Sequence, residues 1–113
     1  MVKFSIFLRK NPDMNQEEFV DYHKNNHAKL FTSLDVVKEY VVKYVQCHAV
    51  PVSMPGFPET YYHAITEIWF NDETDIAKVF GAEEYLKVVR PDEEKFIALH
   101  ECGFLITKEF SVI

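Results

Sequence analysis

The sequence contains little glycine and little cysteine, and neither is arranged as a binding motif. With 3 Gly and 2 Cys in 113 residues, it has no glycine-rich phosphate loop and no CxxC pair for a metal. A serine nucleophile motif is also absent. Cys47 and Cys102 stand alone, and we expect them to be buried free thiols in a reducing compartment.

Basic runs and long apolar runs are missing as well. The formal net charge is −6 and no Lys/Arg cluster stands out, so neither nucleic acid nor an anionic membrane is an expected partner. No window is long enough to span a bilayer. The first apolar stretch has only about five residues, which is shorter than the core of a secretory signal. We therefore expect a soluble cytoplasmic protein.

Aromatic side chains, in contrast, are abundant. The chain holds 10 Phe and 6 Tyr, and 48% of its residues are hydrophobic. Its length suits one compact domain over residues 1–113. So much aromatic bulk can fill one core and still leave apolar surface for a pocket or a partner subunit.

Two kinds of periodicity predict four strands and two helical regions. Alternating, β-branched or aromatic segments predict strands over residues 2–9, 40–50, 61–70 and 102–111. A first helix should begin after Asn15 as its N-cap and end near Leu34. A second should cover residues 75–90, with an interruption near Gly81 and a further turn over 92–99 beyond Pro91. Three prolines make residues 50–58 a loop.

The predicted order β-α-β-β-α-β is the split pattern of an α+β, ferredoxin-like fold. Such a fold has a four-stranded antiparallel sheet with both helices on one face. The other face is bare. Because the strand residues on both faces are substantially apolar, we expect the bare face to meet another subunit.

His23 and His27 lie four residues apart and therefore share one face of the first predicted helix. A zinc site needs further ligands and the HExxH pattern is absent, so we expect no metal. One alternative is that a histidine packs against the sheet in a structural hydrogen bond. The other is that His27 is a general acid or base in a cleft, because an ordinary imidazole titrates near neutrality.

Glu67 lies in the middle of a strand that otherwise reads as buried. A buried carboxylate needs a partner, and buried carboxylates with shifted pKa values are typical of active sites. The alternative is a structural bond, or an ion pair with Arg9 or Lys43. Alternation places Glu67 on one face with His63, Ile65 and Trp69. Trp69 is expected in the core more than as a stacking platform.

On the second strand, Tyr44, Gln46 and His48 share a face. They offer hydrogen-bond donors and acceptors that suit a small oxygenated ligand, but aromatic side chains are also enriched at dimer interfaces. The loop that follows could cover a pocket, with Tyr61 and Tyr62 at its hinge.

Several segments, taken in order, resemble EthD-type proteins. The opening RKNPDMNQEEF is followed by Tyr22 and by His27-Ala28, and HAITEIWF then resembles the third strand of that family. The C-terminal half shows similar segments, at residues 84–85, 91–96 and 107–109. The sequence departs from the family at His23, where an aromatic residue is usual, and at His63, where Asp is common.

This resemblance implies a dimeric α/β-barrel, in which two protomers stack the bare faces of their sheets. It also implies chemistry on small oxygenated carbon skeletons without a bound metal, as in related decarboxylases and a muconolactone methylisomerase. We therefore expect a small cofactor-independent enzyme that transfers protons by decarboxylation, isomerisation or cyclisation. His27 and Glu67 are the expected catalytic residues. The expected substrate-binding residues are Tyr22, His23, Tyr44, His48, Tyr62, His63 and Trp69.

Two other functions remain open at this point. The domain could bind a small hydrophobic ligand, or stabilise a partner enzyme, without catalysing anything. Haem-related chemistry comes last, since proteins of the same superfamily bind haem but a histidine alone does not support it. An enzyme predicts a polar, water-accessible pocket that contains His27 and Glu67, whereas a binding module predicts an apolar pocket with both residues held in structural bonds.

Overall fold

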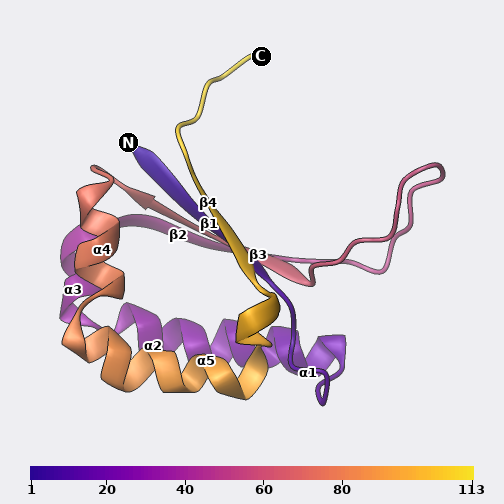
Figure 1. Cartoon of the computed structure of the whole chain (residues 1–113), viewed down its shortest axis with the longest axis horizontal. Coiled ribbons are helices and arrows are strands. Elements are labelled where there is room, and N and C mark those ends of the chain that lie inside the picture. The colour runs from indigo at the N-terminus through magenta and orange to yellow at the C-terminus, as the bar shows by residue number, and fades with distance from the viewer.

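The computed structural model describes residues 1–113 and has a four-stranded antiparallel sheet with helices on one face (Figure 1). The strands are β1(Val2–Leu8), β2(Val41–His48), β3(Ala64–Phe70) and β4(Gly103–Thr107), in the spatial order β2-β3-β1-β4. The central strand pairs set Phe4 opposite both Ile68 and Ile106. The predicted ferredoxin-like α+β fold is confirmed.

Two helical regions lie side by side on one face of the sheet (Figure 1), and we call them the first and second helical layers. The first begins as predicted. Asn15 accepts a hydrogen bond from the Glu18 amide, and the Glu18 side chain accepts one from the Asn15 amide. This capping box satisfies backbone donors that the first turn leaves without partners. The helix then runs through α1(Gln16–Asp21), the π-helical turn η1(Tyr22–His27) and α2(Ala28–Thr32).

The second helical layer contains α4(Thr74–Phe80), the π-helical turn η2(Tyr85–Val89) and α5(Arg90–Phe96). It breaks at Gly81, as expected, but it continues through Pro91. The Arg90 amide bonds to the Tyr85 carbonyl, five residues back. This wider turn accommodates a residue that cannot donate a hydrogen bond and whose ring would crowd the preceding turn.

The predicted boundaries differ from the structure in four main places, one of which is the last strand, since it ends at Thr107 rather than at residue 111. A separate helix, α3(Asp35–Tyr40), lies between the first helical layer and β2. The third strand begins at Ala64, because residues 61–63 belong to the long loop that projects from one end of the sheet in Figure 1. The further turn predicted over residues 92–99 is α-helical only as far as Phe96, and a short 3-10 helix, η3(Leu99–Glu101), follows. No helix is both long and apolar enough to cross a membrane.

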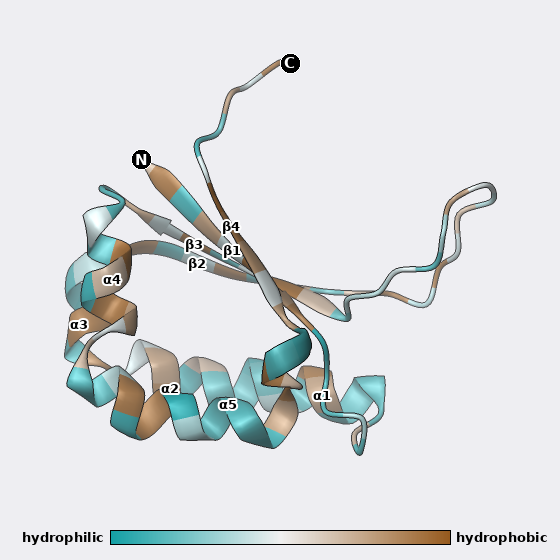
Figure 2. Cartoon of the chain, viewed as in Figure 1, coloured by the Kyte–Doolittle hydropathy of each residue, from teal (hydrophilic) through white to brown (hydrophobic).

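The core lies between the sheet and the helices. Even-numbered residues of β1 and β3, such as Phe4 and Ile68, face the helices, and the largest fully buried side chains are Phe19, Phe70 and Phe96. The opposite sheet face is more polar than expected. Cys47 is exposed there rather than buried, and both cysteines are free. On the edge strand β4, Phe104, Leu105 and Ile106 are all exposed. Figure 2 colours part of this strand brown because its residues are hydrophobic.

Candidate functional site

A cavity of about 330 Å³ lies between the helix-facing side of the sheet and the helical layer. Thirteen of its 19 lining residues are hydrophobic. The polar ones are few, and they come from η1, from strands β2 and β3, and from the second helical layer. They are His23, His27, Thr66, Arg90 and Glu93, together with the hydroxyl-bearing Tyr44 and Tyr85, which are counted among the thirteen. An apolar cavity with a few convergent polar groups is the usual form of a small-molecule site.

His27 reaches this cavity because buried residues recur every four positions along the first helical layer. Phe19, His23, His27 and Phe31 are all buried and lie on one side of the helix. In the second layer, Asp92 and Phe96 share the buried side. Packing of the two layers brings Asp92 against His27, although the two residues are 65 positions apart in sequence.

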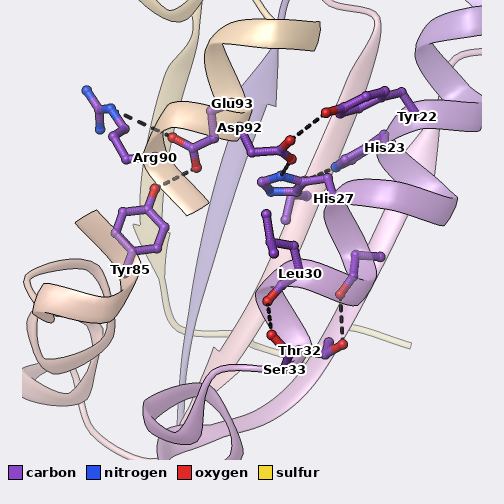
Figure 3. Close-up of polar contacts among 12 residues, drawn as sticks. Tyr22, His23, His27, Leu30, Thr32, Ser33, Tyr85, Arg90, Asp92 and Glu93 are labelled. Carbon is purple, nitrogen blue, oxygen red and sulfur yellow. Dashed lines mark hydrogen bonds and ion pairs between the residues drawn. The ribbon is translucent and has the colours of Figure 1, made fainter. Parts of the chain in front are cut away.

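Asp92 holds both His27 and Tyr22 (Figure 3). The His27 Nδ1 atom lies 3.1 Å from one Asp92 carboxylate oxygen, and the Tyr22 hydroxyl donates to the other at 2.5 Å. Burial and the neighbouring Asp92 raise the pKa of Tyr22 to about 12, so Tyr22 stays a donor. Because a carboxylate only accepts, His27 carries its proton on Nδ1, and its Nε2 remains as an acceptor.

Burial lowers the pKa of His27, while the hydrogen bond and the charge of Asp92 act against that shift. The ring is therefore held neutral at neutral pH but has a carboxylate that stabilises the protonated form. It also packs against Phe96, with the ring centroids 4.7 Å apart. A neutral, oriented imidazole beside a carboxylate is suited to accept a proton from a bound molecule.

His23 is held in a structural hydrogen-bond network. Its Nδ1 lies 3.0 Å from Nε2 of His48, and its Nε2 lies 3.2 Å from the Thr66 hydroxyl. The ring stacks on Phe19 and on Phe96. Burial, together with the nearby His27 and His48, lowers the pKa of His23 to about 3. His23 therefore remains uncharged and positions the helix against the sheet.

Tyr44, Gln46 and His48 lie on the helix-covered face of the sheet, where Gln46 and His48 contact His23. Gln46 donates to the Tyr44 hydroxyl at 2.8 Å and to the His23 carbonyl at 3.0 Å. Tyr44 lines the cavity next to Phe31, and burial raises its pKa to about 12. The shared face predicted for these strand residues is confirmed, while their role in binding stays a prediction.

The expected pairing of His27 with Glu67 is wrong. Glu67 lies on the opposite face of the sheet, where it forms an ion pair with Lys3 at 2.8 Å and accepts a hydrogen bond from Cys47 at 3.5 Å. The Lys3 hydrogen bond lowers the pKa of Glu67. Strand alternation places residues on a face correctly, but it does not say which face the helices cover.

Five of the predicted binding residues do not line the cavity: Tyr22, His48, Tyr62, His63 and Trp69. Trp69 is not in the core, because it lies on the bare face between Lys3 and Lys43, whose ammonium groups are 5.4 Å and 4.7 Å from its ring. Tyr62 packs against Phe7. The His63 Nδ1 accepts a hydrogen bond from the Lys10 amide at 3.0 Å. Tyr62 and His63 line a separate hollow beside α1.

Sequence reasoning missed four polar residues of the second helical layer: Tyr85, Arg90, Asp92 and Glu93. The Tyr85 hydroxyl donates to Glu93 at 2.5 Å, and the Arg90 Nε lies 3.8 Å from the other Glu93 oxygen (Figure 3). One signal was available. Val89, Asp92 and Phe96 follow the spacing of a buried helix face, and an acid in such a row needs a partner.

Comparison with known families gives one match that covers most of the chain. The sequence model of the EthD domain matches residues 11–100. No curated protein is detectably similar in sequence.

Three solved structures share the fold at low sequence identity. An EthD family protein from Bacillus halodurans has a TM-score of 0.71 at 18% identity, over 97% of this chain and 99% of that one. A dimeric ferredoxin-like protein of unknown function from Bacteroides fragilis has a TM-score of 0.66 at 14% identity, over 96% and 95%. A DABB family protein from Mesorhizobium loti scores 0.62 at 12% identity, over 97% of both chains.

Proposed function

The chain belongs to the EthD family, and from this premise we propose that it is a small enzyme that moves protons on a small oxygenated or aromatic acid. The reaction would be a decarboxylation, an isomerisation or a cyclisation carried out by side chains, within one domain over residues 1–113. The observation that carries this proposal is the Tyr22–Asp92–His27 chain of hydrogen bonds, in which His27 lines the cavity and Asp92 and Tyr22 lie behind it.

In this mechanism His27 is the base. Its Nε2 takes a proton from the substrate, and the imidazolium that results is stabilised by the Asp92 carboxylate on Nδ1. Tyr22 keeps Asp92 in place from the other side. The buried setting strengthens these electrostatic interactions and limits competing water. His27 then returns the proton to a different atom, so the reaction needs no other reactant.

The remaining predicted residues take supporting roles in this proposal. Tyr44 and Thr66 line the cavity, and their hydroxyl groups would bind substrate oxygen atoms. His23 and His48 would hold the floor of the site in shape. Glu67, Tyr62, His63 and Trp69 lie outside the cavity and are not assigned a part in the reaction.

The test is exchange of acidic C–H groups in D₂O, followed by proton NMR over a panel of small keto acids and hydroxylated aromatic acids. We expect at least one compound to exchange or decarboxylate faster with the protein. His27→Gln should lower that rate by about 10²-fold or more. His63→Gln is the matched control and should keep the rate, because His63 lies outside the cavity. A rate unchanged in His27→Gln would rule out His27 as the base.

A non-catalytic alternative has two observations in its favour. The cavity wall is mainly hydrophobic, and Glu67 is held in an ion pair with Lys3 outside the cavity. A ligand-binding or accessory protein of a degradation or biosynthetic pathway would hold a small apolar molecule there. Compounds of the same panel would then bind but never exchange or lose CO₂. Binding with complete absence of turnover over the whole panel would favour this function over the enzyme.

We also propose a homodimer that forms through the bare face of the sheet. Apolar residues of β4 and of the C-terminal segment are exposed, among them Leu105, Phe110 and Val112, and burial of such surface would stabilise an interface. Sedimentation at micromolar concentration should give twice the 13.3 kDa chain mass. A 13.3 kDa species at every concentration would contradict the dimer. The free thiols of Cys47 and Cys102 would suit the reducing cytoplasm, which we propose as its location.

A further inference from the structure

A second polar cluster lies in the same cavity and has no part in the mechanism above. It consists of Tyr85, Arg90 and Glu93, which all line the cavity from the second helical layer (Figure 3). Arg90 is the only Lys or Arg among the lining residues. The inference drawn from this cluster rests on the proposed function, because it concerns which acids the site takes.

The ion pair between Arg90 and Glu93 is loose. Their closest nitrogen and oxygen atoms are 3.8 Å apart, which is beyond hydrogen-bond distance, and the Arg90 side chain is 53% exposed while that of Glu93 is 12% exposed. Glu93 is firmly bound on its other side by the Tyr85 hydroxyl. Arg90 can therefore turn toward a second anion without disturbing the fold.

The rest of the cavity suits an apolar body. The rings of Phe31, Phe80 and Phe96 line it, and Phe31 and Phe80 stack on one another with centroids 6.0 Å apart. A flat ring placed among these aromatic side chains would gain apolar burial and edge-to-face contacts. A ligand with a carboxylate at one end would then direct its charge to Arg90.

We propose that Arg90 binds the carboxylate of an aromatic monocarboxylate in this cavity, and that Glu93 takes up a proton as the ligand binds. Two carboxylates would otherwise share one guanidinium in a partly buried site. Like charges at such short distance favour protonation of one of them. The ligand carboxylate and the Glu93 carboxyl would then share that proton through a hydrogen bond.

The charged and titratable groups around Glu93 are consistent with this uptake. Burial raises the pKa of Glu93 and Asp92 raises it further, while the Tyr85 hydrogen bond and the Arg90 charge hold it down. Tyr44 and Cys102 also lie within electrostatic range of Glu93. A ligand that draws Arg90 away removes one of the two effects that keep Glu93 ionised, so the pKa rises on binding.

The first part of the test uses benzoate and benzamide, which have nearly the same shape but differ in charge. Titration calorimetry should show that Arg90→Gln weakens benzoate binding by about tenfold or more and leaves benzamide binding unchanged. Arg90→Lys, which keeps the charge, should recover part of the affinity. Lys87→Gln removes an exposed charge paired with Glu83 on the same helix and is the matched control.

The second part counts protons. Benzoate is titrated at one pH in two buffers whose ionisation enthalpies differ, and uptake of up to one proton per ligand is expected. Glu93→Gln, which keeps an acceptor for Tyr85, should abolish the uptake, whereas His27→Gln should not. Equal affinity for benzoate and benzamide, or no effect of Arg90→Gln, would overturn the carboxylate site. Uptake that persists in Glu93→Gln would overturn the role of Glu93. Both parts measure binding and need no turnover. A failure of the carboxylate site can therefore be distinguished from a failure of the proposed enzymatic activity.

Discussion

Asp92→Ala is expected to lower the free energy of unfolding by about 2–5 kcal/mol. The carboxylate accepts from His27, which is buried, and from the Tyr22 hydroxyl, which is half-buried. Removing the acceptor leaves both donors without this partner, and an unsatisfied buried donor costs on the order of 1–3 kcal/mol. Urea denaturation of the wild type and of the variant measures the difference.

A double-mutant cycle assigns the loss to its causes. Tyr22→Phe removes one donor and keeps the ring packed on Phe96, so it should cost less than Asp92→Ala. The loss of stability in the double variant should then be smaller than the sum of the losses in the two single variants. Tyr22→Phe has already removed the hydroxyl that Asp92→Ala would leave without an acceptor. Strict additivity would mean that the hydrogen bond between Tyr22 and Asp92 adds nothing to stability. Glu67→Gln is a control for removing a carboxylate elsewhere and should cost less than about 1 kcal/mol.

A fall in stability below neutral pH is the second large effect we expect. The pKa of His23 is lowered from 6.5 to about 3 by burial, so the unfolded chain binds a proton at a pH where the folded chain does not. The neutral ring therefore supports the folded state fully above pH 6.5, and this support is lost as the pH falls toward 3. The loss is about 1.4 kcal/mol per pH unit and about 5 kcal/mol over the whole interval.

Urea midpoints at pH 7 and pH 5 measure this loss. His23→Gln removes the titrating ring and should flatten the dependence over that interval, although it is less stable at pH 7 because the contacts with His48 and Thr66 change. His100→Gln, at an exposed position, should keep the wild-type slope. A slope that is the same in His23→Gln as in the wild type would show that other groups cause the acid sensitivity. Burial also lowers the pKa of His27, which adds a smaller loss of the same sign.

The order of the elements could be predicted because each one rests on local physics. Asn15 and Glu18, three residues apart, indicate where the first helix begins, and the capping box between them confirms it. Alternation on β1 and β3 places Phe4 and Ile68 toward the helices. The errors occur where local signals conflict: Tyr40 favours a strand by residue type but ends a helix, and Pro91 lies inside a helix rather than at its end.

The candidate site was likewise predictable only where the signal comes from residues close together in sequence. Spacing along one helix identified His27 as a buried, cavity-lining histidine. Its carboxylate partner could not be found from spacing, because Asp92 comes from a distant helix and Glu67 was the only acid within a predicted buried strand. The alternation that groups Glu67 with Trp69 is correct, yet both lie on the uncovered face. A local pattern has the same form on either face of a sheet.

For this protein, the sequence by itself determined the order of the four strands and the two main helical regions, the family, and the shared helix face of His23 and His27. These follow from capping, periodicity and turn chemistry, which act between residues close together in the chain. Only the tertiary structure decided which sheet face the helices cover, which carboxylate binds His27, and that Arg90 and Glu93 enter the same cavity. Those outcomes depend on how two helical layers pack over one sheet, where contacts join residues far apart in sequence.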